Sequence, residues 1–474
     1  MVKLIARTRF DLLAIGTRTA ATRVMSEELS WWADLDEIVL GTVILDRTDH
    51  DFGWIMLVRD KVGRFRCADV EASLPSERIA TARLRVAMAE KIREPSFPGY
   101  VEQGDEPDTP LDLFVDRGIP DERLHKYFIE VRDREGRSPA KKVFQAISPW
   151  LLSSDPHLVK EFQESQFDQR LWEIYLWAMF RDQGYDAFHQ QAPDLIIRSP
   201  WFRFAVEATT VGPSTAGPLA RHPEPKTPEE FADFLTNYMP MKFGSALTSK
   251  LNKQDADGRH YWEKPGLEEM PFVLAIADFH KDASPDQLGS MTYSQGGLYC
   301  YLYGTRVSVD VSSGRPVIRN EPVAEHTYNG KTVPSGFFDQ PGAENVAAVL
   351  FSNAATLAKF DRLGVLAGFA PKNHRYIRSG FQFDPDPMAL VGIPFVIDVQ
   401  DPRYDEFWGD EVQVFHNPRA KRSLPLEALP DAAHHFFQDG QLMSSDRAGR
   451  VLGSTTAILH LTESLGEDSK KASR

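Results

Sequence analysis

Cysteine is scarce in this sequence, since the 474 residues include only Cys67 and Cys300. A disulfide framework and a cysteine-rich zinc module are therefore excluded, and this usage is typical of a reducing compartment such as the cytoplasm. Long apolar runs are also missing, because the densest, 171–180, spans ten residues and includes a glutamate, whereas a membrane helix needs about 20. The sequence thus predicts a cytoplasmic protein with no membrane-spanning segment.

Positive charge is in deficit, with 54 lysines and arginines against 68 aspartates and glutamates and a formal net charge of −14. Such a chain is not held to DNA by its overall charge, so contact with nucleic acid would need local basic patches. Two candidate patches are the segments 372–378 (KNHRYIR) and 417–422 (NPRAKR). No GxxxxGK[ST] or GxGxxG pattern precedes a helix, which excludes the common glycine-rich phosphate loops.

Composition and length predict a folded multidomain protein, because 42% of the residues are hydrophobic and 26% are charged, as in folded domains of about 150 residues each. The succession of helix and strand patterns along the chain predicts the α/β class. We expect an N-terminal β-rich α+β module at 1–150, a core at 151–290 and a C-terminal α/β extension at 291–474 that can complete the core sheet. In the N-terminal module, β-rich runs predict strands at 37–45, 52–59, 63–70 and 127–132. Ser76 is the expected N-cap of a helix in this module.

From about residue 153, the sequence predicts a helix, two strands, a further helix and a further strand. Beyond about residue 290, apolar runs predict strands at 298–311, 346–351, 393–399 and 411–415 and a helix near 354–363. His434 and His435 are adjacent, so on a helix they would point about 100° apart and could hardly share one metal ion. We therefore expect structural roles for these two histidines.

The segment 171–180 (LWEIYLWAMF) is apolar around the whole helical wheel except at Glu173, a pattern typical of a buried helix. Burying an unpaired carboxylate costs several kcal/mol, so Glu173 must find a cation, a donor or a proton. One interpretation is a structural ion pair with Arg170 or Arg181. The other is a functional role, which depends on the segments that follow.

Two strands are expected soon after this helix, at 193–197 (PDLII) and 204–209 (FAVEAT), with a tight turn between them. A hairpin centred on the 200–201 peptide bond, without a β-bulge, places Asp194 opposite Glu207. Opposed side chains have Cβ atoms about 4.5–5.5 Å apart, and like charges there are destabilising. A hard divalent cation such as Mg²⁺ would offset this repulsion, since it binds carboxylate oxygens and keeps several waters.

The order of a helical glutamate, a Pro-Asp pair and a Glu-x-Thr sequence resembles the PD-(D/E)xK nuclease superfamily, which has the restriction-endonuclease-like fold. The resemblance covers about residues 167–280. It implies an α-β-β-β-α-β core around a mixed sheet and Mg²⁺-dependent cutting of DNA, with Mn²⁺ as a substitute. It also implies that Asp194, Glu207 and the Ala208 carbonyl bind the metal, and that Glu173 positions a second metal or a metal-bound water.

The sequence departs from the family pattern at Thr209, which stands where the family has a lysine and which faces the same side of the strand as Glu207. The family's lysine orients or helps to deprotonate the attacking water, and threonine offers a hydroxyl but no cation. Some similar proteins move this lysine to a neighbouring helix, and the helix expected after the hairpin carries several lysines. We predict Lys250 as the relocated lysine, with Lys253 and Lys242 as alternatives.

The resemblance therefore predicts a metal-dependent deoxyribonuclease, with DNA expected ahead of RNA and a role in restriction or phage defence that rests on family analogy. Paired cuts on two strands favour a homodimer in such enzymes. Two alternatives stay open. Thr209 is compatible with a catalytically inactive nuclease-fold protein that binds nucleic acid or a protein partner, and the motif matches would be coincidental if Asp194 and Glu207 lay far apart.

Overall fold

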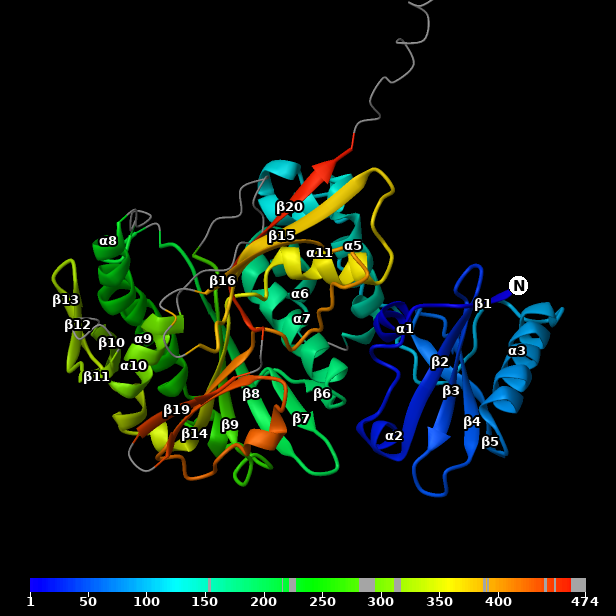
Figure 1. The fold of residues 1–474 in the computed structure, drawn as a ribbon, viewed down its shortest axis with the longest axis horizontal. Helices are drawn as coiled ribbons and strands as arrows, with labels where there is room; N and C mark the ends of the chain where they lie inside the picture. The colour runs from blue at the N-terminus through cyan, green and yellow to red at the C-terminus, as the bar shows by residue number, and fades with distance from the viewer. Residues whose placement is uncertain are drawn as a thin grey trace, which may run out of the picture.

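A computed structural model of the chain describes residues 1–151, 155–214, 216–220, 227–280, 295–310, 317–386, 389, 392–438, 441–446 and 449–461. A mixed eight-stranded sheet with helices on both faces forms the centre, and a five-stranded antiparallel sheet lies beside it (Figure 1). The predicted α/β class is confirmed at this level. Among the described helices, none has the length and apolar character that crossing a membrane requires.

The N-terminal sheet is an antiparallel meander whose strands pair in sequence order. It consists of β1 (Val2–Leu4), β2 (Ser26–Asp34), β3 (Val39–Asp46), β4 (Phe52–Arg59) and β5 (Phe65–Leu74), with α1 (Arg7–Leu13) and α2 (Ala20–Met25) between the first two strands. Helix α3 (Glu77–Arg93) covers one face through Leu84 and Met88, and the Ser76 hydroxyl accepts a hydrogen bond from the Ile79 N–H at 3.4 Å. Three strands and the helix cap predicted here are confirmed.

Helices connect this sheet to the central one. They are α4 (Lys126–Asp133), α5 (Ser138–Ile147), α6 (Leu158–Glu164) and α7 (Phe167–Asp182). The strand predicted at 127–132 is wrong, because these residues form α4. Its aromatic and β-branched residues favour a strand, but Phe128 and Val131 are three positions apart and pack together into the helical core, while His125 caps the first turn.

The central sheet has the order β19-β18-β17-β14-β9-β8-β7-β6. Its strands are β6 (Asp186–His189), β7 (Leu195–Arg198), β8 (Arg203–Val211), β9 (Phe272–Asp278), β14 (Val346–Ser352), β17 (Gln413–His416), β18 (Ala433–Gln438) and β19 (Gln441–Ser445). After α7 the chain forms the antiparallel strands β6, β7 and β8. It then crosses one face through α8 (Pro228–Asp233), a π-helical segment (Phe234–Tyr238) and α9 (Met239–Leu251), and returns as β9, parallel to β8.

Both faces of this sheet are buried, which explains why all seven residues of β9 are buried. Helix α7 lies on one face, where the Trp172 indole N–H donates to the Ala275 carbonyl at 3.2 Å. Helices α9 and α10 (Gln295–Tyr303) lie on the other, where Phe243 and Leu247 pack near Leu274 in a second core. Residues of α7 and α9 can therefore approach β8 from opposite sides.

The C-terminal part contributes four strands to the central sheet and also forms smaller units. These are the hairpins β10 (Thr305–Asp310)–β11 (Val317–Pro322) and β12 (Glu325–Tyr328)–β13 (Lys331–Pro334), helix α11 (Leu357–Leu366), and a sheet of β16 (Ile393–Asp398), β15 (His374–Gln382) and β20 (Val451–His460). Helix α11 packs closely on α5 at Gly364, where a Cβ atom would lie 2.5 Å from the Pro139 carbonyl oxygen.

The sequence-based assignments of this part need two corrections. Residues 298–303 of the strand predicted at 298–311 belong to helix α10, because Leu298, Tyr301 and Leu302 recur at helical spacing and enter the second core. His434 and His435 lie on strand β18, so they point to opposite faces. The strands predicted at 346–351, 393–399 and 411–415 and the helix near 354–363 overlap observed elements. The boundary predicted at 290/291 falls outside the described residues.

Candidate active site

The hairpin of β7 and β8 has the register predicted from the sequence. Leu195 pairs with Val206, and the pairing continues without a shift to the turn. Asp194 stands one residue before β7, and its Oδ2 atom accepts a hydrogen bond from the Ala208 N–H at 2.7 Å. The Asp194 carboxylate therefore lies against the Glu207–Ala208 segment of β8, as the hairpin predicts.

Glu207 is the most enclosed carboxylate of the site, with 2% of the residue exposed. Its Oε1 atom lies 2.5 Å from the Lys250 Nζ atom of α9 and accepts a hydrogen bond from the Tyr261 hydroxyl at 2.6 Å. Its Oε2 atom is buried and has no hydrogen-bond partner among the residues that the structure describes. The two oxygens of one carboxylate thus have very different surroundings.

Negative charge is crowded around Asp194. Burial raises the pKa of the Asp194 carboxyl well above its usual range, and the charges of Glu207 and Glu173 raise it further, while Lys250 opposes the change. Burial also raises the pKa of Glu173, against the effect of Arg170. Three carboxyl groups from α7, β7 and β8 therefore interact electrostatically, and an additional cation would stabilise their ionised forms.

Glu173 meets β8 through its neighbour Gln169, which lies one turn earlier on α7. Arg170 donates to the Glu173 Oε2 atom at 2.7 Å, and the Gln169 Nε2 atom donates to Oε1 at 2.9 Å. The same Nε2 atom lies 3.5 Å from the Ala208 carbonyl oxygen, and the Gln169 Oε1 atom accepts from the Thr210 hydroxyl at 3.2 Å. The ion pair with Arg170 that the sequence analysis left open is present, and it holds Glu173 beside the carbonyl predicted to bind metal.

Of the three lysines considered, Lys250 is the one that the structure brings to Glu207. The Lys253 Nζ atom lies 5.8 Å from the ring centroid of Tyr261, and Lys242 donates to the Ser214 hydroxyl at 2.5 Å. Thr209 is 9% exposed and follows Glu207 on the same face of β8. The choice of Lys250 over its two alternatives therefore agrees with the observed contacts.

The carboxylates of the site form a limited donor set for a metal ion. The described part of the chain contains no group of three or more histidine, cysteine, aspartate or glutamate side chains that could hold one. The expected convergence of Glu173, Asp194 and Glu207 on a single ion is therefore not found, because Glu173 is bound by Arg170 and Gln169. Asp194, Glu207 and the Ala208 carbonyl remain as an all-oxygen set suited to Mg²⁺, and the unpartnered Oε2 atom of Glu207 fits a cation.

Sequence reasoning missed two residues of this site. Gln169 precedes Glu173 by four positions and so shares its helical face, a spacing that could have identified it. Tyr261 carries no such signal, because it lies in a short 3₁₀ turn (Tyr261–Glu263) between α9 and β9. Burial raises the pKa of the Tyr261 hydroxyl, and the charge of Glu207 adds to the effect, so the hydroxyl remains a donor.

The second predicted basic patch is paired with acids, and the first is partly buried. Arg378 of the first patch is buried, with 3% of the residue exposed. In the second patch, each cation has an acidic partner from a distant segment: Arg419–Asp339 at 2.9 Å, Lys421–Glu344 at 3.1 Å and Arg422–Glu269 at 2.9 Å. These segments therefore offer less charge to a phosphate backbone than the sequence suggests.

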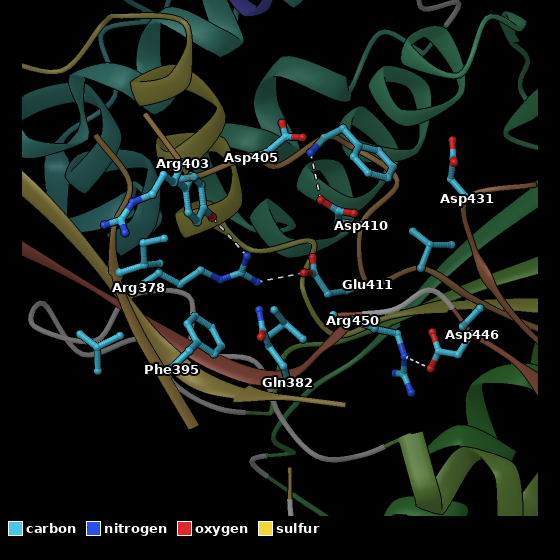
Figure 2. A pocket seen from close by; sticks show the side chains of 18 residues that line it. Arg378, Gln382, Phe395, Arg403, Asp405, Asp410, Glu411, Asp431, Asp446 and Arg450 are labelled. Atoms are coloured by element: carbon cyan, nitrogen blue, oxygen red, sulfur yellow. Dashed lines mark hydrogen bonds and ion pairs between the residues drawn. The ribbon is translucent and has the colours of Figure 1, made fainter. Parts of the chain in front are cut away.

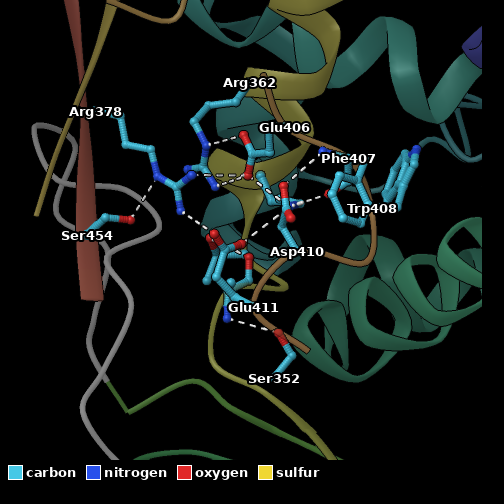
Figure 3. Close-up of polar contacts among 12 residues, drawn as sticks. Ser352, Arg362, Arg378, Glu406, Phe407, Trp408, Asp410, Glu411 and Ser454 are labelled. Atoms are coloured by element: carbon cyan, nitrogen blue, oxygen red, sulfur yellow. Dashed lines mark hydrogen bonds and ion pairs between the residues drawn. The ribbon is translucent and has the colours of Figure 1, made fainter. Parts of the chain in front are cut away.

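A second group of buried charges, which we call the Glu406 cluster, lies between α11, β15 and the loop 404–411 (Figure 3). It consists of Lys359, Arg362, Arg378, Glu406 and Glu411. Arg362 donates to both oxygens of Glu406 at 2.8 and 2.9 Å, and Lys359 lies 2.8 Å from Glu406 Oε1. Although burial acts in the opposite direction, these cations and Arg378 hold the pKa of Glu406 well below its usual value.

A cavity of about 430 Å³ opens beside this cluster (Figure 2). Its three arginines each have an acidic partner. Arg378 lies 3.1 Å from Glu411 and Arg403 lies 2.7 Å from Asp401, while Arg450 is paired with Asp446. Because these arginines are paired with acids, the cavity offers little uncompensated positive charge to an anion.

Comparisons with protein-family models, with curated proteins and with solved structures found no match to this chain.

Proposed function

We propose that the protein is a Mg²⁺-dependent endonuclease of the PD-(D/E)xK type that hydrolyses DNA phosphodiester bonds. The observation that carries the proposal is the contact between Lys250 and Glu207 at 2.5 Å, beside an Asp194 carboxylate that binds the neighbouring Ala208 N–H. These residues come from a hairpin and from the helix that follows it. They supply the aspartate, glutamate and lysine that the nuclease pattern requires.

The order of elements supports the same proposal. Helix α7, the antiparallel strands β6, β7 and β8, the crossing helices α8 and α9, and the parallel strand β9 follow one another along the chain. This α-β-β-β-α-β order is the one that the resemblance implies for residues 167–280. Asp194 directly precedes the second strand of this unit and Glu207 lies on the third, in the order that the pattern expects.

Each side chain of the site has a role suited to hydrolysis. Asp194, Glu207 and the Ala208 carbonyl would hold Mg²⁺, which when bound supplies positive charge at the scissile phosphate. Lys250 would orient the attacking water and offset negative charge on the phosphate. Glu173, held by Arg170, would accept a hydrogen bond from the water. Together with Lys250, which acts on it electrostatically, Glu173 would help to align the nucleophile.

A catalytically inactive nuclease-fold protein that binds nucleic acid or a protein partner is the second candidate function. Two observations favour it: Thr209 stands at the usual lysine position, and Lys250 already neutralises Glu207 without a metal. Under this alternative, the Lys250–Glu207 pair is a structural ion pair. The first proposal also includes three further points: DNA rather than RNA as the substrate, a homodimer, and a role in restriction or phage defence.

The test is a cleavage assay with plasmid DNA, oligonucleotides and RNA in Mg²⁺, Mn²⁺ or EDTA. We expect DNA cutting that needs a divalent cation and that is lost in Glu207→Ala and Lys250→Met. Glu269→Ala is the matched control, because Glu269 is an exposed glutamate paired with Arg422 at the surface. A well-folded wild type that binds DNA but cuts nothing in either metal would favour the inactive alternative.

A further inference from the structure

The two oxygens of Glu207 are treated unequally by the fold. Oε1 receives both the Lys250 ammonium at 2.5 Å and the Tyr261 hydroxyl at 2.6 Å, whereas the buried Oε2 receives no donor from the described residues. A carboxylate oxygen accepts about two hydrogen bonds, so Oε1 is satisfied. Leaving a buried anionic oxygen without a partner costs at least as much as losing a hydrogen bond, so Oε2 needs an occupant.

We infer that Tyr261 is a positioning residue that, together with Lys250, keeps Oε1 of Glu207 engaged and so presents Oε2 to a divalent cation. This inference rests on the proposed function. It assigns a role to a residue that lies outside the PD-(D/E)xK pattern. It also selects one oxygen of Glu207 as the metal ligand, which the pattern by itself does not specify.

Tyr261 is well held for such a role. It is 3% exposed, and its ring stacks on Phe272 of β9 with centroids 5.5 Å apart and planes at 17°. The Lys264 Nζ atom lies 5.5 Å from the ring centroid on a segment that continues into β9. The capping interaction of Glu263 with the His260 N–H, at 2.8 Å, closes the turn that carries the tyrosine. The hydroxyl therefore meets Glu207 from a rigid support.

Tyr261 also explains how Lys250 can serve two functions. Without Tyr261, Lys250 would be the only donor to Oε1 among the described residues, so a movement of Lys250 toward a phosphate or a water would leave the carboxylate free to rotate. The Tyr261 hydroxyl keeps its hydrogen bond to Oε1 during this movement. The lysine side chain is 22% exposed and can move, whereas the tyrosine is enclosed.

A cation is favoured over an ordered water at Oε2 because of the charge nearby. Asp194 is directed at the same segment of β8 through the Ala208 N–H. Glu173 and Glu207 both act electrostatically on Asp194. A water would donate a hydrogen bond to Oε2 but would leave the repulsion among the carboxylates in place. A divalent cation would bind Oε2 and also offset this repulsion.

The experiment compares Mn²⁺ binding to the full chain, followed by electron paramagnetic resonance and calorimetry, in wild type, Tyr261→Phe and Tyr301→Phe. Tyr301 is the matched control, because it is also buried, with 2% of the residue exposed. Among the described residues, its hydroxyl forms hydrogen bonds to Thr248 and Gln340 and none to the candidate site. Loss of a hydrogen bond from a neighbouring residue to a side chain that binds the metal typically weakens metal binding 10–100-fold. We expect a loss of about that size in Tyr261→Phe, and less than about 3-fold in Tyr301→Phe.

A kinetic readout separates positioning from general damage. In Tyr261→Phe, the Mg²⁺ concentration for half-maximal cutting should rise about 10–100-fold, while kcat at saturating Mg²⁺ stays within a few-fold of wild type. Thermal unfolding checks that the variant is folded. Equal Mn²⁺ affinities in wild type and Tyr261→Phe would overturn the inference and leave the nuclease proposal intact. A folded wild type that neither binds Mn²⁺ nor cuts DNA would overturn both.

Discussion

The Glu207 site and the Glu406 cluster both bury carboxylates beside cations, but they distribute hydrogen bonds differently. Both oxygens of Glu406 are bonded: Oε1 to Arg362 and Lys359, and Oε2 to Arg362 and the Tyr404 hydroxyl at 2.6 Å. Glu207 has two donors on Oε1 and none from the described residues on Oε2. The first arrangement is complete within the chain, whereas the second is incomplete.

The two regions also differ in the balance of charge. Glu406 lies among three cations, Lys359, Arg362 and Arg378. The Glu207 site brings the carboxyls of Asp194 and Glu173 near a glutamate that has one lysine partner. A fold can use a fully paired cluster to join distant segments, whereas a buried carboxylate oxygen without a donor, close to further acids, is costly and marks a candidate ligand site. The difference separates a structural ionic cluster from a candidate active site.

The same substitution, glutamate to glutamine, should reduce DNA cleavage at Glu207 and the free energy of unfolding at Glu406. Under the proposed function, Glu207→Gln removes a metal ligand and one of the crowded negative charges. We expect a loss of cleavage of about 10³-fold or more, with a free energy of unfolding within about 1 kcal/mol of wild type. Plasmid cleavage and urea unfolding of the same preparation measure both. Cleavage at the wild-type rate would remove Glu207 from the mechanism.

Glu406→Gln should instead affect folding. It leaves the buried Arg362 without this anion and Lys359 with its longer contact to Glu411 at 3.4 Å, and breaking one partner of a buried ion pair typically costs about 3–5 kcal/mol. The molecules that remain folded should cleave DNA at the wild-type rate, because the Glu406 cluster supplies no residue to the Glu207 site. Urea unfolding, with activity expressed per folded molecule, tests this. An unchanged free energy of unfolding would mean that the ion pairs of Glu406 do not stabilise the fold.

Asp410, next to the Glu406 cluster, should make stability depend on pH. Burial raises its pKa from 3.8 to about 7, with Lys359 opposing and Glu411 and Glu406 adding to the rise. The folded state therefore binds more protons than the unfolded state between about pH 4 and 7, so the free energy of unfolding falls as pH rises through this window. The change in pKa corresponds to at most about 4 kcal/mol.

Asp410→Asn should flatten that dependence. The amide cannot ionise, so the variant should lose less stability than wild type between pH 4 and 7. Unfolding midpoints in urea at several pH values provide the measurement. A variant curve parallel to that of wild type over this range would assign the pH dependence to other groups.

The smallest effect is expected at a surface pair. Arg422 and Glu269 lie 2.9 Å apart, and the Glu269 side chain is 90% exposed. Exposed ion pairs contribute about 0–1 kcal/mol, so Arg422→Ala should barely change the unfolding free energy or DNA cleavage. DNA binding measured against salt concentration sharpens this prediction. A clearly smaller salt dependence in the variant would show that Arg422 contacts phosphate after all.

The hairpin at the candidate site could be predicted from residues close in sequence. The two apolar runs and the tight turn at residues 199–202 set the register that brings Asp194 to Glu207. The buried helix that carries Glu173 follows from its apolar wheel. Lys250 was a choice among three lysines on one helix, and periodicity limited that choice without deciding it. Local patterns therefore predicted the residues of the candidate site and limited the choice of lysine.

Other assignments failed where distant contacts override local preference. The segment 127–132 favours a strand by composition, yet its apolar residues pack into a helical core as α4. The segment 417–422 is basic in sequence, but Asp339, Glu344 and Glu269 neutralise it from far along the chain. The packing core of the first segment and the acidic partners of the second cannot be identified from these segments alone, because both depend on how the chain folds.

For this protein, short-range periodicity and turn chemistry determined the helix-and-hairpin unit and the approximate position of its acidic residues. Only the tertiary structure decided which lysine reaches Glu207, that Tyr261 shares its Oε1 atom, and that Glu173 is held by Gln169 and Arg170. The physical reason is the range of the interactions. Hairpin register depends on neighbours within about ten residues, whereas a buried carboxylate takes its partners from every element that packs around it.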